Sequence, residues 1–105
     1  MAAYIIVHVD VTDPDRYEIY KAMAPPSIRE YGGRYLTRGG AIEVLEGDWT
    51  PKRLVILEFP DMERARAFWN SPEYADAKAL RIATTTSHMV LLDGLDRQPW
   101  EVDAP

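Results

Sequence analysis

Residues 58–74, EFPDMERARAFWNSPEY, decide how the chain folds, because they contain the end of a strand, a capped helix and the start of a second helix. Asp61 suits the N-cap of the first helix, since its carboxylate accepts hydrogen bonds from the first turn. Ser71 followed by Pro72 is a second start signal, because proline is tolerated at the first helical position. The stretch therefore predicts a strand, a helix, a break at the serine and a short second helix over 72–81.

A strand and a long helix are predicted before this stretch. Residues 4–11, YIIVHVDV, are rich in β-branched side chains, which favour a strand. Asp13 and Pro14 then suit the N-cap and the first position of a helix. This helix should end at the glycine pair 32–33, where positive φ is commonly needed. The proline pair 25–26 is expected to interrupt this helix with a kink, after which the last turns restart at residues 26–27, because proline cannot donate a backbone hydrogen bond.

The segment between the two helical regions predicts two paired strands. Its glycines at 39–40 are consistent either with a hairpin turn or with a bulge inside one long strand. The polar stretch 46–52, EGDWTPK, is the better turn. A bulged strand over 34–46 is therefore preferred, paired with a strand over 53–59. A last strand is predicted over 85–93.

The predicted order of strand, helix, strand, strand, helix, strand is typical of the α+β ferredoxin-like fold. In that fold a four-stranded antiparallel βαββαβ sheet carries the helices on one face. Residues 1–94 are expected to form this single domain. Residues 95–105 are expected to form a C-terminal tail that is disordered or docks on a partner subunit.

Composition limits the class of function. The chain has 105 residues and a formal net charge of −5, which argues against binding to nucleic acid. The absence of cysteine excludes disulfides, thiol catalysis and cysteine-ligated metals. No apolar run approaches the length of a membrane span, and no signal peptide is visible. A cytoplasmic protein without a membrane partner is the expectation.

Alternating side chains give the predicted sheet two different faces. One face is purely apolar and should contact the helices: Ile5, Val7, Val9, Val11, Val55, Leu57 and Phe59. The opposite face is too apolar for open water, since it carries Tyr4, Ile6, Leu54 and Ile56. Because one helical layer cannot cover both faces, we expect a homodimer that forms through the non-helical face of the sheet.

Three segments carry a resemblance to a known family: YGGRYLTRGG (31–40), EGDWTPKRLVILEFP (46–60) and FWNSPEY (68–74). In this order they resemble a family of small, mostly bacterial proteins described as a domain of unknown function. The family belongs to the dimeric α/β barrel superfamily, and the likeness covers roughly residues 3–94. The resemblance implies the fold and dimerisation. It implies no single activity, because related proteins include cofactor-free oxygenases, isomerases, haem enzymes and ligand-sensing domains.

His8, Glu58 and His88 are the first group of candidate catalytic residues, since all three are predicted on the non-helical face. A histidine with a carboxylate partner makes a general base, and two histidines with a carboxylate match a divalent metal by ligand type. No tight spacing motif links the three residues. Hydrogen-bonded interface histidines are therefore the preferred interpretation, and no metal or cofactor is predicted.

A second group of residues predicts a ligand site between the helices and the sheet. Trp69 and Tyr74 flank the helix break, and aromatic side chains of this kind line small-molecule pockets. Tyr17 and Tyr20 would line the same gap, and Arg38 beside its glycines could pair with a carboxylate or phosphate. Core packing of the aromatics, and a strand bulge at the glycines, remain the simpler interpretations.

Two further arginines, Arg53 and Arg81, could also bind an anion, although solvated surface pairs are the preferred interpretation. The first functional hypothesis is a small cofactor-independent enzyme that acts on a small organic molecule. Its alternatives are a non-catalytic ligand-binding or sensing domain, and a structural dimerisation module. A pocket with a titratable residue of perturbed pKa would favour the enzyme.

Overall fold

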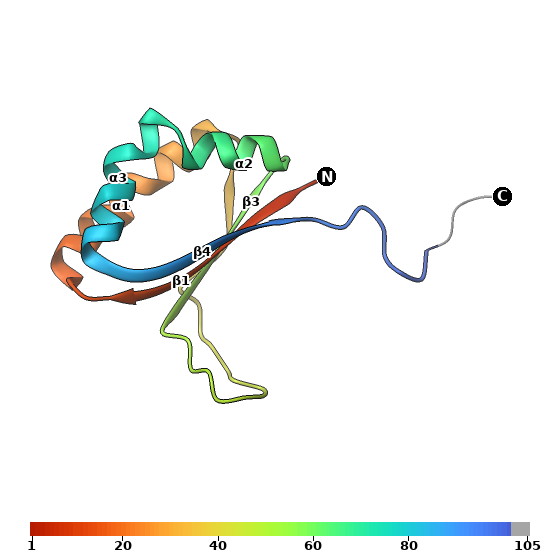
Figure 1. Cartoon of the computed structure of the whole chain (residues 1–105), viewed down its shortest axis with the longest axis horizontal. Helices are drawn as coiled ribbons and strands as arrows, with labels where there is room; N and C mark the ends of the chain where they lie inside the picture. Colours follow the sequence, from red (N-terminus) through yellow and green to blue (C-terminus); the bar gives the residue numbers. More distant parts are fainter. Residues whose placement is uncertain (102–105) are drawn as a thin grey trace.

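The computed structural model describes residues 1–101 of the chain. The elements follow in the order β1 (Ala3–Val11), α1 (Pro14–Glu30), β2 (Arg34–Arg38), β3 (Arg53–Phe59), α2 (Met62–Trp69), α3 (Pro72–Thr84) and β4 (Thr85–Asp93). All three helices lie over one face of the sheet (Figure 1). The predicted α+β ferredoxin-like arrangement is confirmed. No helix within the described residues is long and apolar enough to cross a membrane.

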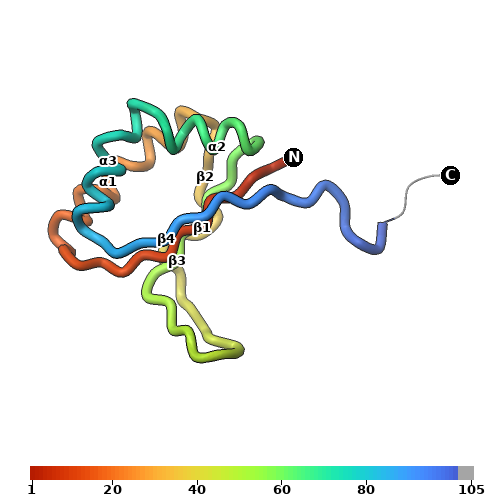
Figure 2. Tube along the Cα trace, viewed as in Figure 1, coloured from red at the N-terminus to blue at the C-terminus, as the bar shows by residue number. Residues whose placement is uncertain are grey.

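The four strands form one antiparallel sheet in the order β2-β3-β1-β4. Strand β1 lies in the centre, where Val7 pairs with Val55 of β3 and with Met89 of β4. Strands β2 and β4 form the two edges of the sheet. The trace in Figure 2 shows β1, β3 and β4 crossing close together beneath the helical layer.

Each predicted helix start is confirmed by a side-chain cap. The carboxylate of Asp61 accepts a hydrogen bond of 2.7 Å from the Arg64 backbone N–H. The hydroxyl of Ser71 accepts one of 3.1 Å from Tyr74. Asp13 caps α1 in the same way. These contacts satisfy N–H groups that have no partner inside the helix, so they fix where each helix begins.

The core lies between the helices and the predicted apolar face of the sheet. Alternate residues of β1 and β3 are buried there, together with residues from each helix; the largest fully buried side chains are Val9, Phe59, Phe68, Tyr74 and Thr84. The strand faces are therefore as predicted. Gly33 lies against this core, where a Cβ atom would meet the Phe59 ring at 2.6 Å and Ile28 at 2.8 Å. A side chain at this position would overpack the core.

The predicted second strand is wrong in length. Strand β2 ends at Arg38, and residues 39–52 form a loop that projects from the side of the sheet away from the helices (Figure 1). The bulge is present, but it lies between Tyr35 and Thr37 rather than at the glycines. Strand β3 begins only two residues before Val55, the partner of Arg38, and the last backbone bond to it is the 3.0 Å bond from the Gly39 N–H to the Leu54 carbonyl.

Helix α1 also differs from the prediction. It is continuous from Pro14 to Glu30, with Pro25 and Pro26 inside it. Residue 32 follows with φ of +79°, the left-handed conformation expected after a helix. Helix α3 is longer than predicted, because it continues to Thr84. The predicted tail is described only as far as Glu101, and residues 102–105 lie outside the described residues.

Candidate functional site

A cavity lies between the helical layer and the sheet, at the gap where the sequence predicts a ligand site. Its volume is about 30 Å³, which is room for about two water molecules. Apolar residues from the core form its floor. Four tyrosines and three arginines also line it: Tyr17, Tyr20, Tyr35, Tyr74, Arg38, Arg53 and Arg81. Four of the five predicted ligand-binding residues are thus brought together, namely Tyr17, Tyr20, Arg38 and Tyr74.

A chain of polar contacts crosses the deep end of the cavity. The hydroxyls of Tyr20 and Tyr74 lie 3.0 Å apart and share a hydrogen bond. The Arg81 Nε–H donates to the Tyr74 hydroxyl at 3.2 Å, and its Nη1 donates to the Ser87 hydroxyl at 2.6 Å. Because Tyr74 accepts from the arginine, its own proton is free to point toward Tyr20. The cavity therefore contains an oriented relay of donors.

Arg81 is buried, which corrects the expectation of a solvated surface pair. The residue is 6% exposed, and no aspartate or glutamate within residues 1–101 forms an ion pair with it. The hydroxyls of Tyr74 and Ser87 are neutral partners. A guanidinium held in this way keeps its full positive charge beside the cavity, because arginine does not lose its proton in proteins.

Arg53 occupies space that a glycine leaves open. Its Nε–H donates to the Tyr17 hydroxyl at 3.2 Å, and its guanidinium lies over the Tyr17 ring. Gly39 has φ of +69°, and a Cβ atom at this position would collide with the Arg53 guanidinium. The first glycine of the RGG stretch therefore makes room for an arginine that lines the cavity. The structure shows no strand bulge there.

Arg38 lies at the outer end of the cavity. Its Nη2 donates to the backbone carbonyl of Lys21 at 2.7 Å, and its guanidinium lies over the ring of Tyr35. This bond connects the edge strand β2 to helix α1 across the gap. Because Arg38 is exposed, water competes for the bond, and breaking it costs little.

Two tyrosines of the cavity, Tyr20 and Tyr35, hold their protons strongly. Burial raises the pKa of the Tyr20 phenol above its ordinary value, and the neighbouring Tyr74 adds to this shift. Burial likewise raises the pKa of Tyr35. Both phenols are therefore donors rather than bases at neutral pH. No histidine, aspartate or glutamate of the described residues lines the cavity.

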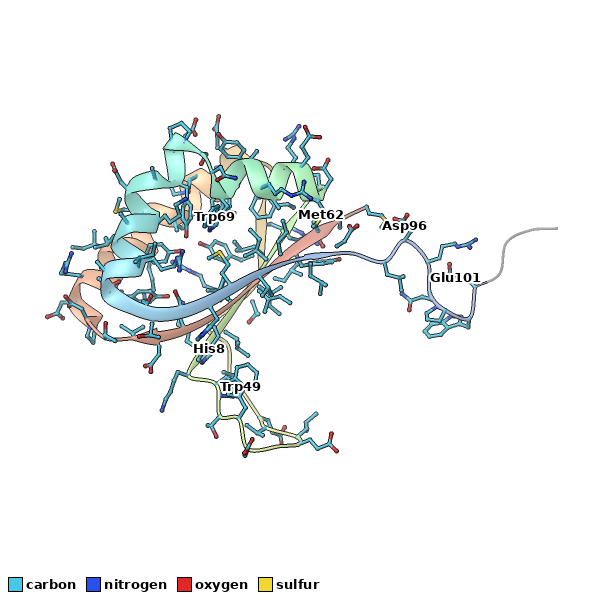
Figure 3. All side chains as sticks on the ribbon, viewed as in Figure 1. His8, Trp49, Met62, Trp69, Asp96 and Glu101 are labelled. Atoms are coloured by element: carbon cyan, nitrogen blue, oxygen red, sulfur yellow. The ribbon has the colours of Figure 1, made fainter. Side chains whose placement is uncertain are left out.

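The two histidines lie on the opposite face of the sheet. His8 and His88 are paired across β1 and β4, with their ring centroids 6.3 Å apart. His8 Nε2 accepts a hydrogen bond of 3.1 Å from the Lys52 backbone N–H, and Trp49 of the projecting loop packs against its ring. Figure 3 shows His8 and Trp49 together beneath the sheet. They line an apolar hollow of about 400 Å³ with Ile6, Leu54, His88 and Val90.

Glu58 does not join the histidines, although it shares their face. It is in register with Tyr4, four residues along β1 from His8, and its carboxylate pairs with Arg34 at 3.0 Å. Within residues 1–101 no three histidine, aspartate or glutamate side chains are grouped so that they could hold a metal ion. The His8, Glu58 and His88 constellation is therefore not assembled within one chain.

Trp69 is also separated from the cavity. It is 42% exposed and lines a different groove of about 210 Å³ beside β4. The ammonium of Lys78 lies 3.8 Å from the centroid of its ring. Tyr74, by contrast, is 1% exposed and belongs to the cavity. Across the helix break, Trp69 therefore lies in the groove beside β4, whereas Tyr74 lies in the cavity.

Tyr35 is absent from the predicted site, Ser87 offers a hydroxyl that no nucleophile motif surrounds, and Arg81 was expected on the surface. A signal for Arg81 was present, because Tyr74, Ala77, Arg81 and Thr84 recur at spacings of three and four residues. These spacings place them on one face of a helix, and all four are buried. An arginine on the buried stripe of a helix is an unusual residue that deserves a functional interpretation.

Comparison with known proteins agrees with this fold. Several solved structures, including the following three, are similar over nearly the whole chain. A protein of unknown function from Rhodopseudomonas palustris is 19% identical, with a TM-score of 0.74, and the match covers 91% of this chain and 84% of that one. A dimeric ferredoxin-like protein of unknown function from Jannaschia sp. CCS1 is 18% identical, with a TM-score of 0.68, and the match covers 90% and 100%.

The third structure is SnoaB, a cofactor-independent oxygenase from Streptomyces nogalater. It is 14% identical, with a TM-score of 0.61 and a match covering 93% of this chain and 97% of that one. No curated protein matches the chain. Residues 2–95 match the model of a family described as Domain of unknown function (DUF1330). The chain therefore belongs to the DUF1330 family.

Proposed function

We propose that the protein binds a small organic molecule in the cavity between its helices and its sheet. The observation that carries this proposal is the lining itself, since four tyrosines and three arginines meet where a small domain would otherwise bury only apolar side chains. Ligand sites are typically apolar with a few oriented polar groups. The floor of the cavity is apolar, and its hydroxyl and guanidinium groups are fixed by hydrogen bonds.

The ligand enters past Arg38. The cavity holds only about two water molecules when the Arg38 bond to the Lys21 carbonyl is closed. Rotation of this exposed side chain uncovers an opening between β2 and α1 while both backbones stay in place. The donors at the deep end then orient the ligand, while the Tyr17 and Tyr20 rings, which are stacked 5.5 Å apart, contact its body.

Cofactor-independent catalysis in the same cavity is a second candidate function. It is favoured by the relay from Arg81 through Tyr74 to Tyr20, because these donors would stabilise negative charge that develops on a ligand oxygen. The described part of the cavity offers no carboxylate or imidazole base. This candidate is tested by incubating a bound ligand with the protein in air and recording its mass. A new mass supports catalysis, whereas recovery of unchanged ligand supports binding alone.

We further propose that two copies associate through the non-helical face, as in a dimeric α/β barrel. Ile6 pairs with Ile56 and Val90 across three strands on this face. Val90 and Leu92 are 57% and 55% exposed in the single chain. A patch of this kind is favourable to cover at about 25 cal/mol per Å² of apolar surface. His8 and His88 would then be interface residues.

The binding proposal is tested by NMR of protein labelled in its tyrosine rings. The chain has six tyrosines, of which Tyr17, Tyr20, Tyr35 and Tyr74 line the cavity. Tyr4 and Tyr31 lie outside it and serve as internal controls. A library of small organic fragments should contain members that shift the cavity resonances in a saturable way. Shifts confined to Tyr4 or Tyr31, or no saturable shift at all, would refute the proposal.

A further inference from the structure

We infer that the ligand of this cavity is a small organic anion, of the carboxylate class, whose charge is bound at Arg81. The inference rests on the proposed function, since it names the class of ligand for the same site. It depends on three features of the described residues: an arginine buried without an acidic partner, a cavity lining whose charged side chains are all cations, and donors that remain unused.

The burial of Arg81 is the first feature. A buried charge is costly unless a group of opposite charge accompanies it. Arg81 is 6% exposed, yet the ion pairs within residues 1–101 do not involve it. Its hydrogen bonds to two hydroxyls satisfy donors without neutralising charge. A bound anion would provide the missing neutralisation.

The positive charge of the basic side chains that line the cavity is the second feature. Arg38, Arg53, Arg81 and Lys21 line the cavity, and no aspartate or glutamate of residues 1–101 does. Lys21 pairs with Glu18 at 2.8 Å, but the three arginines have no carboxylate partner in the described chain. The whole protein carries a net charge of −5, so this positive interior is contrary to its overall charge. Such a site attracts anions selectively.

The unused donors are the third feature. The described hydrogen bonds of Arg81 use Nε and Nη1 and leave Nη2 without an acceptor in residues 1–101. Nη1 and Nη2 of a guanidinium form a fork that matches the two oxygens of a carboxylate. The Tyr20 phenol adjoins this end of the cavity through Tyr74 and can donate to the same anion. A neutral ligand would leave this fork unmatched.

Matched pairs of probes test whether the site prefers a negatively charged ligand to a neutral one of the same shape. Acetate and acetamide represent small ligands, and benzoate and benzamide represent larger ones that require Arg38 to rotate. Titration at neutral pH is followed by the ring resonances of labelled tyrosines. In at least one pair the carboxylate should bind at least about tenfold more tightly than its amide. A hydrogen bond between two charged groups is stronger than a bond to a neutral group by an energy that corresponds to about this factor in affinity.

The outcomes separate this inference from the proposed function. If an amide binds as tightly as its carboxylate, the site is a neutral-ligand site and the inference is overturned, while the proposed function stands. If neither member of either pair shifts the cavity tyrosines but neutral fragments do, the inference again fails alone. If nothing shifts them, the proposed function and the inference fail together.

Variants then test whether Arg81 holds the charge. Arg81→Gln should abolish the preference for carboxylate over amide, and Arg53→Gln should reduce it. Arg29→Gln, an exposed arginine on α1 outside the cavity, should leave the preference unchanged. If Arg81→Gln does not fold, Arg81→Lys replaces it and should weaken carboxylate binding about tenfold, because lysine lacks the planar fork. Unchanged carboxylate affinity in the folded Arg81 variant would overturn the inference.

Discussion

Removal of the Tyr74 hydroxyl gives the sharpest test of the polar relay in the cavity. Tyr74 is 1% exposed, and phenylalanine would fill the same space without the oxygen. Two hydrogen bonds depend on that oxygen, one with the Tyr20 hydroxyl at 3.0 Å and one from the Arg81 Nε at 3.2 Å. A neutral bond contributes about 1 kcal/mol and a bond to a charged group about 1.5–3 kcal/mol.

Tyr74→Phe should therefore lower the free energy of unfolding by about 2.5–4 kcal/mol, because both bonds are lost and a buried guanidinium N–H is left without its acceptor. Tyr20→Phe loses only the bond between the two hydroxyls and should cost about 1 kcal/mol. The double variant should cost about as much as Tyr74→Phe alone, since the bond of Tyr20 is already absent.

Urea unfolding of the four proteins at one fixed protein concentration measures these differences. Tyr31→Phe is a matched control, because its hydroxyl bonds to Glu73 on the exposed surface, and it should cost less than Tyr74→Phe. Equal costs for Tyr20→Phe and Tyr74→Phe, or costs that simply add in the double variant, would show that the relay does not exist as described.

The remaining predictions concern pH, association and the glycine beside Arg53. Burial raises the pKa of Tyr20 and Tyr35, so these phenols lose their protons at lower pH in the unfolded chain than in the folded one. Their contribution to the free energy of unfolding should therefore be constant below about pH 10 and fall above it. Urea midpoints measured across alkaline pH should show this fall, and it should be shallower in Tyr20→Phe. Ile6→Asp should convert dimers to 12.0-kDa monomers in sedimentation, whereas Ile19→Asp, on the exposed side of α1, should not; dimers that persist in Ile6→Asp would exclude the proposed interface. Gly39→Ala should cost about 1 kcal/mol of backbone strain and weaken benzoate binding, because the new methyl group displaces Arg53. Gly47→Ala is its control, since φ there is +91° and no neighbour lies near its Cβ, so it should leave benzoate binding intact. Equal effects of the two variants on benzoate binding would count against the role of Gly39.

Local signals explain why most of the fold could be predicted from the sequence. The caps at Asp13, Asp61 and Ser71 act within one turn, so a short window contains both partners of each bond. The alternation along β1 and β3 is likewise local, and it reported correctly which face contacts the helices. Both kinds of evidence are independent of distant parts of the chain.

The errors arose where a distant partner decides the outcome. Residues 41–45, AIEVL, have the composition of a strand, but β3 is too short to pair with them. Trp69 and Tyr74 are equally aromatic, yet Phe68 rather than Trp69 occupies the buried stripe of α2. Glu58 shares a face with His8, but the register places it opposite Tyr4. Strand register and helix phase are set by tertiary packing, which a single sequence does not display.

Arg81 shows the same limit for the candidate site. Its charge suggested solvent, while its spacing from Tyr74 and Ala77 placed it on the buried stripe of α3. The sequence contained both signals, and only the packing of α3 against the sheet decides between them. Ser87, which orients the guanidinium, is contributed by the following strand, and nothing in the sequence links its hydroxyl to Arg81.

A crystal of the protein soaked with benzoate tests the central claim most directly, because the ligand can choose between the tyrosine-lined cavity and other hollows, among them those beside Trp69 and beside His8 and Trp49. We expect density for benzoate between the helices and the sheet, with its carboxylate at Arg81, its ring against Tyr17 and Tyr20, and the Arg38 bond to the Lys21 carbonyl broken. Benzoate bound beside Trp69, or in the hollow of His8 and Trp49, with the tyrosine-lined cavity still closed, would contradict the claim.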